Sequence, residues 1–191
     1  MVYKIAITGG IGSGKSVALK ILKDLGCKTF SCDKISRTIY RDAELKDNVR
    51  EIFGEEVFSS DGRVLRKRLA KKVFSDKALV KALNELTHCK IRQKLLSAMD
   101  RVKGVAVAEV PLLFESGMQN DFDKVIILMR DETVRFLAVS ERDGLSQEQI
   151  ERRMANQIDY NKLDKTAYTV ICNDGDIESL RDKLRCVVEG L

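Results

Sequence analysis

Gly9 to Ser16 read GGIGSGKS and directly follow the apolar run Tyr3 to Thr8. This spacing matches G-x-x-x-x-G-K-[ST], the P-loop that holds the phosphates of a nucleotide. Glycines let backbone N–H groups turn toward phosphate oxygens, the lysine reaches the β- and γ-phosphates, and the hydroxyl that follows is a ligand for Mg²⁺. We therefore predict a metal ligand at Ser16 and a nucleotide-binding set of Gly10, Ile11, Gly12, Ser13, Gly14, Lys15, Ser16 and Val17.

The segments around this loop are those that a P-loop requires. A strand is predicted before it, and Val17 to Leu25 continue at helical spacing until Gly26, a typical helix C-cap. The positive end of that helix faces the loop and favours bound phosphate. A glycine-rich turn that binds nothing is the alternative, and this context argues against it.

Composition sets the broad class of the protein. A length of 191 residues suits one domain, and 44% hydrophobic with 33% charged residues is typical of a globular protein. The apolar runs are strand-sized and no signal-peptide pattern opens the chain, so we expect a cytoplasmic protein that does not associate with membranes. Five cysteines without a C-x-x-C pair favour free thiols over disulfides or zinc. The net charge of +5 suits an anionic small molecule as well as nucleic acid.

Strand and helix patterns alternate along most of the chain. Strands are predicted over Tyr3–Thr8, Lys28–Ser31, Val105–Glu109, Lys124–Met129 and Tyr168–Cys172, with helices between them. Residues 60–103 are almost entirely helical in pattern. We predict a P-loop α/β three-layer sandwich with a parallel sheet: a core of residues 1–59 and 104–191, an inserted helical lobe over about 60–103, and a helical lid over about 142–160.

A small-molecule kinase needs an acidic group for the acceptor hydroxyl and arginines that neutralise transferred charge. Asp33 lies just beyond the second predicted strand, where its carboxylate would act on the acceptor; capping the following helix is the alternative. Arg142 and Arg153 flank a turn suited to a mobile lid over ATP. We predict Lys15, Asp33 and Arg142 as catalytic residues.

Two other segments of the chain suggest different functions. Residues 161–164 spell N-K-x-D, the guanine-reading motif of GTPases, but they follow a polar segment and the chain has no D-x-x-G, so we interpret them as a solvated helical stretch. A basic run would suit a nucleic-acid-binding ATPase, yet no aromatic residues are interleaved with it for base stacking. We interpret it as a solvated face with one or two phosphate contacts; it comprises Arg63, Arg66, Lys67, Arg68, Lys71 and Lys72.

Together with the P-loop, further segments give a more specific resemblance that runs nearly end to end. They are Asp33, Leu65-Arg66, Val73-Phe74, Leu86-Thr87-His88, Ile91-Arg92, Val110 to Gly117 (VPLLFESG), Arg142 to Leu145 (RDGL), Arg153 with Gln157, and Ile171-Cys172-Asn173. With these the chain resembles the dephospho-CoA kinase family. The resemblance implies transfer of the ATP γ-phosphate to the ribose 3′-hydroxyl of dephospho-CoA, the last step of CoA synthesis.

The resemblance also implies which residues contact the substrates. The acceptor would lie against Asp33 together with His88, Arg92, Leu112, Phe114 and Glu115. ATP would contact the P-loop, Arg142, Arg153 and Asn173, the last at a position that borders the adenine in related kinase folds. We expect ATP and Mg²⁺ as cofactors, dephospho-CoA as the small-molecule partner, no nucleic acid, and a monomer with at most weak self-association.

The sequence departs from the family's pattern at three informative positions. Ser31 stands where the family has the first Asp of D-A-D, and Cys89 stands where it usually has proline. Glu109 ends the third strand, where many members have Asp; it would either accept a hydrogen bond from Mg²⁺-bound water or point into the substrate cleft. A nucleoside or nucleoside-monophosphate kinase with the same P-loop remains an alternative, distinguished by its acceptor.

Overall fold

A computed structural model describes residues 1–74, 76–144, 146–155 and 157–191. The chain divides into two compact units, one formed by Met1–Ser31 with Met99–Leu191 and one formed by Cys32–Ala98. We call them the nucleotide unit and the helical unit. The helical unit therefore begins well before the predicted lobe of residues 60–103.

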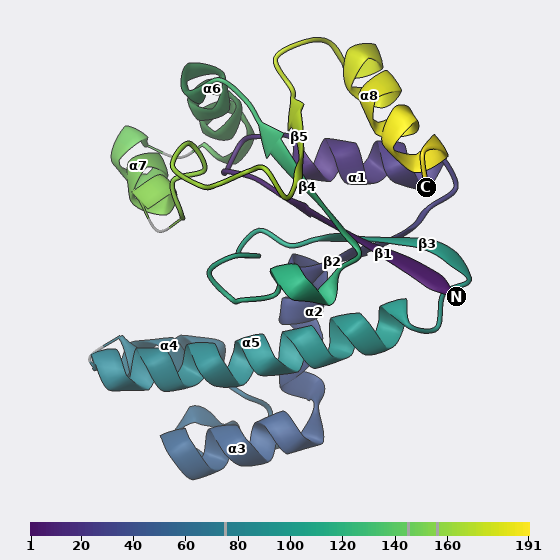
Figure 1. The fold of residues 1–191 in the computed structure, drawn as a ribbon. Helices are drawn as coiled ribbons and strands as arrows, with labels where there is room; N and C mark the ends of the chain where they lie inside the picture. Colours follow the sequence, from purple (N-terminus) through teal and green to yellow (C-terminus); the bar gives the residue numbers. More distant parts are fainter. Residues whose placement is uncertain (75, 145, 156) are drawn as a thin grey trace. The chain divides into compact units, whose positions relative to one another are not determined.

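The nucleotide unit is built on a five-stranded parallel sheet in the order β2-β3-β1-β4-β5 (Figure 1). The strands are β1 (Val2–Thr8), β2 (Lys28–Ser31), β3 (Gly104–Glu109), β4 (Lys124–Met129) and β5 (Thr169–Cys172). Successive residues of β1, Ile5, Ala6 and Ile7, are 0% exposed, so both faces of the sheet are covered. This burial is the pattern of parallel sheets and agrees with the predicted three-layer α/β class.

The α-helices of the nucleotide unit are α1 (Lys15–Asp24), α6 (Glu132–Asp143), α7 (Gln147–Ala155) and α8 (Ile177–Glu189). A short 3₁₀ helix, η3 (Gln119–Asp121), precedes β4. Helices α1 and α8 share one core with the strands, through residues such as Leu22 and Leu184. A capping box opens α7: the Ser146 N–H donates to Gln149 Oε1 at 3.1 Å, and the Gln149 N–H donates to Ser146 Oγ at 3.4 Å.

The helical unit contains α2 (Cys32–Thr38), η1 (Ile39–Arg41), α3 (Ala43–Phe53), η2 (Glu55–Val57), α4 (Arg66–Val73) and most of α5 (Lys77–Met99). Its buried core joins Ile39, Leu45 and Phe53 to Leu69 and Val73. Residues before position 60 thus pack with residues after it. This shared core is the physical reason why the boundary lies near Cys32, which helical periodicity alone did not indicate.

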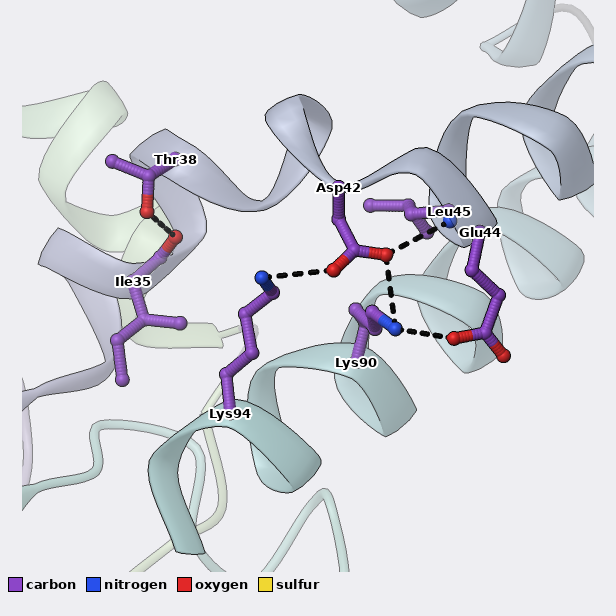
Figure 2. A network of polar contacts seen from close by, with 7 residues as sticks. All are labelled: Ile35, Thr38, Asp42, Glu44, Leu45, Lys90 and Lys94. Carbon is purple, nitrogen blue, oxygen red and sulfur yellow. Dashed lines mark hydrogen bonds and ion pairs between the residues drawn. The ribbon is translucent and has the colours of Figure 1, made fainter. Parts of the chain in front are cut away.

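A network of charged side chains joins α3 to α5 (Figure 2). Asp42 caps α3 by accepting from the Leu45 N–H at 3.2 Å, and it also accepts from Lys90 and Lys94, each with Nζ at 2.9 Å. Lys90 Nζ contacts Glu44 at 2.6 Å as well. Hydrogen bonds from Lys94 and then Lys90 hold the pKa of Asp42 well below its usual range. We call this network the Asp42 clamp.

The clamp fixes which face of α5 is turned toward α3. Lys90 and Lys94 are four residues apart and therefore lie on one face, whereas His88 and Arg92 form an equally spaced pair rotated by about half a turn. The clamp thus directs the His88 and Arg92 face away from α3. Among the described residues no helix is long and apolar enough to cross a bilayer.

Candidate active site

The P-loop has a backbone shape that requires glycine, as two of its positions show. Gly14 caps α1 with φ of +95°, and a Cβ built there would lie 2.4 Å from Asn173 Nδ2. Gly12 has φ of +79°, and its Cβ would lie 2.5 Å from the backbone oxygen of Arg135. Left-handed backbone and close neighbours both exclude side chains here, so the loop can turn its N–H groups inward.

Lys15 lies folded against this loop. Its Nζ donates to the carbonyl oxygens of Gly9 at 2.8 Å and of Gly10 at 3.0 Å, and the residue is only 8% exposed. The ammonium group is therefore held beside the N–H groups of the loop. An anion bound to the loop would meet both kinds of positive charge.

Ser16 lies beside an acidic group. Its hydroxyl donates to Glu109 Oε1 at 2.9 Å, and Glu109 is 7% exposed at the carboxyl end of β3. In the sheet register, Glu109 is the partner of Ile7 in β1 and of Ser31 in β2. Of the two orientations left open for Glu109, the structure has the one that faces the P-loop serine. Hydroxyl and carboxylate oxygens are the ligands that hard cations prefer.

The two predicted lid arginines meet at one carboxylate. Arg142 donates through Nε and Nη2 to the two oxygens of Asp143, both at 2.8 Å, and Arg153 Nη1 lies 3.7 Å from Asp143 Oδ2. The hydrogen bonds to Asp143 raise the pKa of Arg142, and the charge of Glu109 adds to the effect. Arg152 instead pairs with Glu148 on the exposed side of α7. Leu145 and Asn156, within the predicted lid of 142–160, lie outside the described residues.

The segment after α7 is tied to the P-loop and its strand. Gln157 Oε1 accepts from the Ile11 N–H at 2.7 Å, the Ile158 N–H donates to Glu115 Oε1 at 2.9 Å, and the Tyr160 and Thr8 hydroxyls lie 2.9 Å apart. We call residues 157–160 the strap. Burial raises the pKa of the Tyr160 phenol, which therefore stays protonated.

Three residues predicted to contact the acceptor follow β3 in the nucleotide unit. Leu112 is 38% exposed, whereas the Phe114 ring packs edge-on against Tyr160 and Tyr168, with centroids 6.2 and 5.2 Å apart. Glu115 anchors the strap through its bond to Ile158. The structure thus gives Phe114 and Glu115 packing and anchoring contacts that the sequence had not indicated.

Asn173 stands at the carboxyl end of β5, close to the P-loop. Its N–H donates to the Met129 carbonyl at 2.8 Å, and its Nδ2 donates to the Ser13 carbonyl at 2.9 Å. The residue predicted to border the adenine therefore also holds the P-loop backbone in place.

Sequence reasoning missed two arginines beside the P-loop. Arg130 and Arg135 line a pocket of about 580 Å³ together with Gly10, Gln157 and Tyr160. The guanidinium of Arg135 occupies the space that a Cβ on Gly10 would take. Arg130 follows β4 immediately, and a basic residue at the carboxyl end of a parallel strand is the signal that could have identified it.

The remaining predicted residues belong to the helical unit. Asp33 is exposed in the first turn of α2, which begins at Cys32, so Asp33 lies inside the helix rather than at its N-cap. This position disfavours the capping alternative. His88 is half-buried and Arg92 is exposed on α5, on the face that the Asp42 clamp turns away from α3.

The segments that suggested other functions have ordinary structural roles. Residues 161–164 form turns, not the helical stretch we expected, and Asp164 accepts from the Thr166 N–H at 3.0 Å. In the basic run, Lys72 pairs with Glu56 and Arg66 stacks over the Tyr40 ring. Neither arrangement supports guanine reading or nucleic-acid binding.

Comparisons with known proteins identify relatives over nearly the whole chain. The family model described as dephospho-CoA kinase matches residues 3–179. A dephospho-CoA kinase of Chlorobaculum tepidum is 35% identical over 98% of this chain and 94% of its own. A solved Thermus thermophilus structure gives a TM-score of 0.82 at 30% identity, covering 99% of this chain and 97% of that one. Dephospho-CoA kinase from Campylobacter jejuni gives 0.71 at 30% identity, covering 99% and 96%.

Proposed function

This chain belongs to the dephospho-CoA kinase family, whose reaction is the phosphorylation of dephospho-CoA to CoA in the last step of CoA biosynthesis, and from that premise we propose which of its residues carry the reaction. ATP is the phosphoryl donor of this kinase. The observation that carries the proposal is the contact of Ser16 with Glu109 beside the lysine-bearing P-loop. This contact brings the phosphate-binding loop and the Glu109 carboxylate together at one edge of the sheet.

ATP binds the P-loop in this proposal. The N–H groups of residues 10–17, other than those of Ile11 and Ser13, which bond Gln157 and Gly10, receive the β- and γ-phosphates together with the ammonium of Lys15. Asn173 supports the loop by holding the Ser13 carbonyl. Because these donors are fixed before ATP arrives, little reorganisation is needed at the moment of transfer.

Mg²⁺ is the proposed metal. Ser16 and Glu109 supply oxygen ligands suited to it, and no described group of three or more His, Cys, Asp or Glu forms a complete metal cage. Such a partial set fits an ion that takes its other ligands from ATP phosphates and water. Bound there, Mg²⁺ would supply positive charge to the phosphates during transfer.

Arg142 and Arg153 form the proposed lid pair. Both already contact the Asp143 carboxylate, and phosphate oxygens accept from guanidinium groups in the same two-point fashion. If a phosphate replaced Asp143 as the partner of the two guanidinium groups, both positive charges would lie against the transferring group and water would be excluded. The raised pKa of Arg142 keeps it charged throughout.

Asp33 is the proposed base for the acceptor. The 3′-oxygen forms a bond to the γ-phosphorus as the bond from that phosphorus to the bridging oxygen breaks, and the hydroxyl proton passes to Asp33. ADP and CoA are the products. His88 and Arg92 on α5, with Leu112, Phe114 and Glu115, complete the proposed acceptor set. We further propose that the enzyme is a cytoplasmic monomer, which suits its five free cysteines.

An acceptor panel tests the reaction. With MgATP, ADP release is measured in parallel for dephospho-CoA, AMP, UMP, adenosine and no acceptor, and products are identified by mass. We expect turnover with dephospho-CoA alone. Release with AMP, UMP or adenosine alone would make the chain a sibling kinase. Release without any acceptor would make it an ATPase.

Asp33→Asn tests the proposed base. We expect turnover to fall by about 10²–10⁴-fold while ATP affinity, measured by calorimetry, stays unchanged. Asp47→Asn, an exposed aspartate on α3, is the matched control and should keep full turnover. Normal turnover in Asp33→Asn would remove this residue from the chemistry.

A further inference from the structure

Gln157 contacts the P-loop through a backbone group of Ile11. Its side-chain oxygen accepts from the Ile11 N–H at 2.7 Å. Since an N–H can only donate, the chemistry itself fixes which end of the amide faces Ile11. The other end, the NH₂ group, has no hydrogen-bond partner in the described part of the chain, although it carries two donors.

The strap holds this amide in place. Directly after Gln157, the Ile158 N–H is bound by Glu115, and two residues further Tyr160 is 6% exposed and bonded to Thr8. On the other side, the Gln157 N–H donates to the Met154 carbonyl at 3.0 Å. A side chain fixed on both sides of its backbone and at its own oxygen loses little freedom on binding a ligand.

The surroundings of the amide suit a phosphate. Gln157 lines the pocket beside Gly10, and the same pocket is lined by Arg130 and Arg135. Nε of each arginine is buried and has no hydrogen-bond partner among the residues that the structure describes. Two arginines and the amide of Gln157 therefore line one pocket that reaches the P-loop at Gly10.

We infer that Gln157 is an ATP-contacting residue: the Ile11 N–H holds its oxygen, and its NH₂ group donates to a phosphate oxygen of ATP on the P-loop. This inference rests on the proposed binding of ATP to that loop. It assigns the residue a role in ATP recognition, beyond the structural link it makes between the strap and the P-loop.

Two substitutions separate the two ends of the amide. Gln157→Glu keeps an oxygen for the Ile11 N–H but removes both donors, whereas Gln157→Met removes oxygen and donors in a chain of similar length. Gln147→Met is the matched control, because Gln147 is exposed on α7 and, within the described residues, its side chain bonds Glu151 alone. The dissociation constants of ATP and ADP are measured by calorimetry without acceptor, and kcat/KM for ATP is measured with dephospho-CoA.

We expect both Gln157 variants to lose about ten- to a hundredfold in kcat/KM for ATP, the effect of one hydrogen bond to a charged group, while Gln147→Met stays at the wild-type value. Thermal unfolding of all variants checks that the fold is kept. A Gln157→Glu enzyme with wild-type kinetics would show that only the carbonyl matters and would overturn the inference. Tighter ATP binding in Gln157→Met would also overturn it, since the side chain would then compete with phosphate.

These measurements distinguish failure of the proposed function from failure of the proposed role of Gln157. Wild-type enzyme that binds ATP but does not phosphorylate dephospho-CoA would contradict the acceptor assignment and leave the ATP measurements on Gln157 intact. Wild-type turnover with unchanged Gln157 variants would contradict the role of Gln157 alone.

Discussion

Asp42→Ala should destabilise the protein more than any exposed aspartate substitution does, because Asp42 serves two functions in one side chain. It caps α3 at the Leu45 N–H and pairs with Lys90 and Lys94 of α5 (Figure 2). The alanine variant removes the cap and leaves Lys90, whose side chain is 11% exposed, with Glu44 alone.

The contacts set the size of the effect. Loss of an N-cap costs about 1 kcal/mol, and hydrogen bonds to charged groups contribute about 1.5–3 kcal/mol when buried. The Asp42 side chain is 18% exposed and that of Lys94 is 40% exposed, so solvent screens part of the second contribution. We expect the free energy of unfolding to fall by about 2–4 kcal/mol, with a loss of about 2–4 °C in Tm for each kcal/mol.

Urea unfolding of the full chain, followed by circular dichroism, measures the change. Asp47→Ala is the control on the same helix, because its carboxylate is 75% exposed and pairs with Arg50 alone in the described part of the chain, and it should cost less than about 0.5 kcal/mol. Asp42→Asn keeps a good cap and removes the charge, so it should fall between the two. Equal stability of Asp42→Ala and Asp47→Ala would refute the reasoning.

The clamp also predicts how stability depends on pH. Hydrogen bonds from Lys94 and Lys90 depress the pKa of Asp42 in the folded state below its unfolded value of about 3.9. The contribution of the Asp42 charge is therefore fully present above that unfolded value and is lost as pH falls through the folded pKa. The stability difference between wild type and Asp42→Asn should be constant from about pH 8 to 6 and shrink on acidification; a difference that widens in acid would contradict it.

Two further substitutions test the P-loop. Ser16→Ala should reduce turnover by about 10²-fold at low Mg²⁺ and partly recover as Mg²⁺ is raised, whereas a Mg²⁺-independent loss would contradict the metal role of Ser16. Gly14→Ala should abolish measurable ATP binding by calorimetry, because φ is +95° and Asn173 Nδ2 lies 2.4 Å from the new Cβ; Gly62→Ala, with φ of +72° and nothing within 4 Å, should bind ATP normally. Equal ATP affinity in these two glycine variants would show that the contact with Asn173 is unimportant.

The five strands could be predicted from sequence because each is a short apolar run between turn signals, and in all five cases the structure places the strand within one residue of the prediction. The extent of the helical unit could not be predicted. Periodicity reports which face of a helix is buried but not which helices share a core, and Leu45 and Leu69 meet only in the folded unit. The contact of Gln157 with Ile11 joins residues 146 positions apart and leaves no local signal.

Ser31 illustrates how a departure from the family's pattern is accommodated by its neighbour. Ser31 and Glu109 are register partners in adjacent parallel strands, so their side chains lie on the same face of the sheet, and they are 8% and 7% exposed. An aspartate at position 31 would place a second carboxylate beside Glu109 in a site largely removed from water, where like charges repel most strongly. With serine there, Glu109 meets no competing carboxylate on that side and bonds the Ser16 hydroxyl directly. The acidic oxygen beside the P-loop serine is therefore supplied by β3.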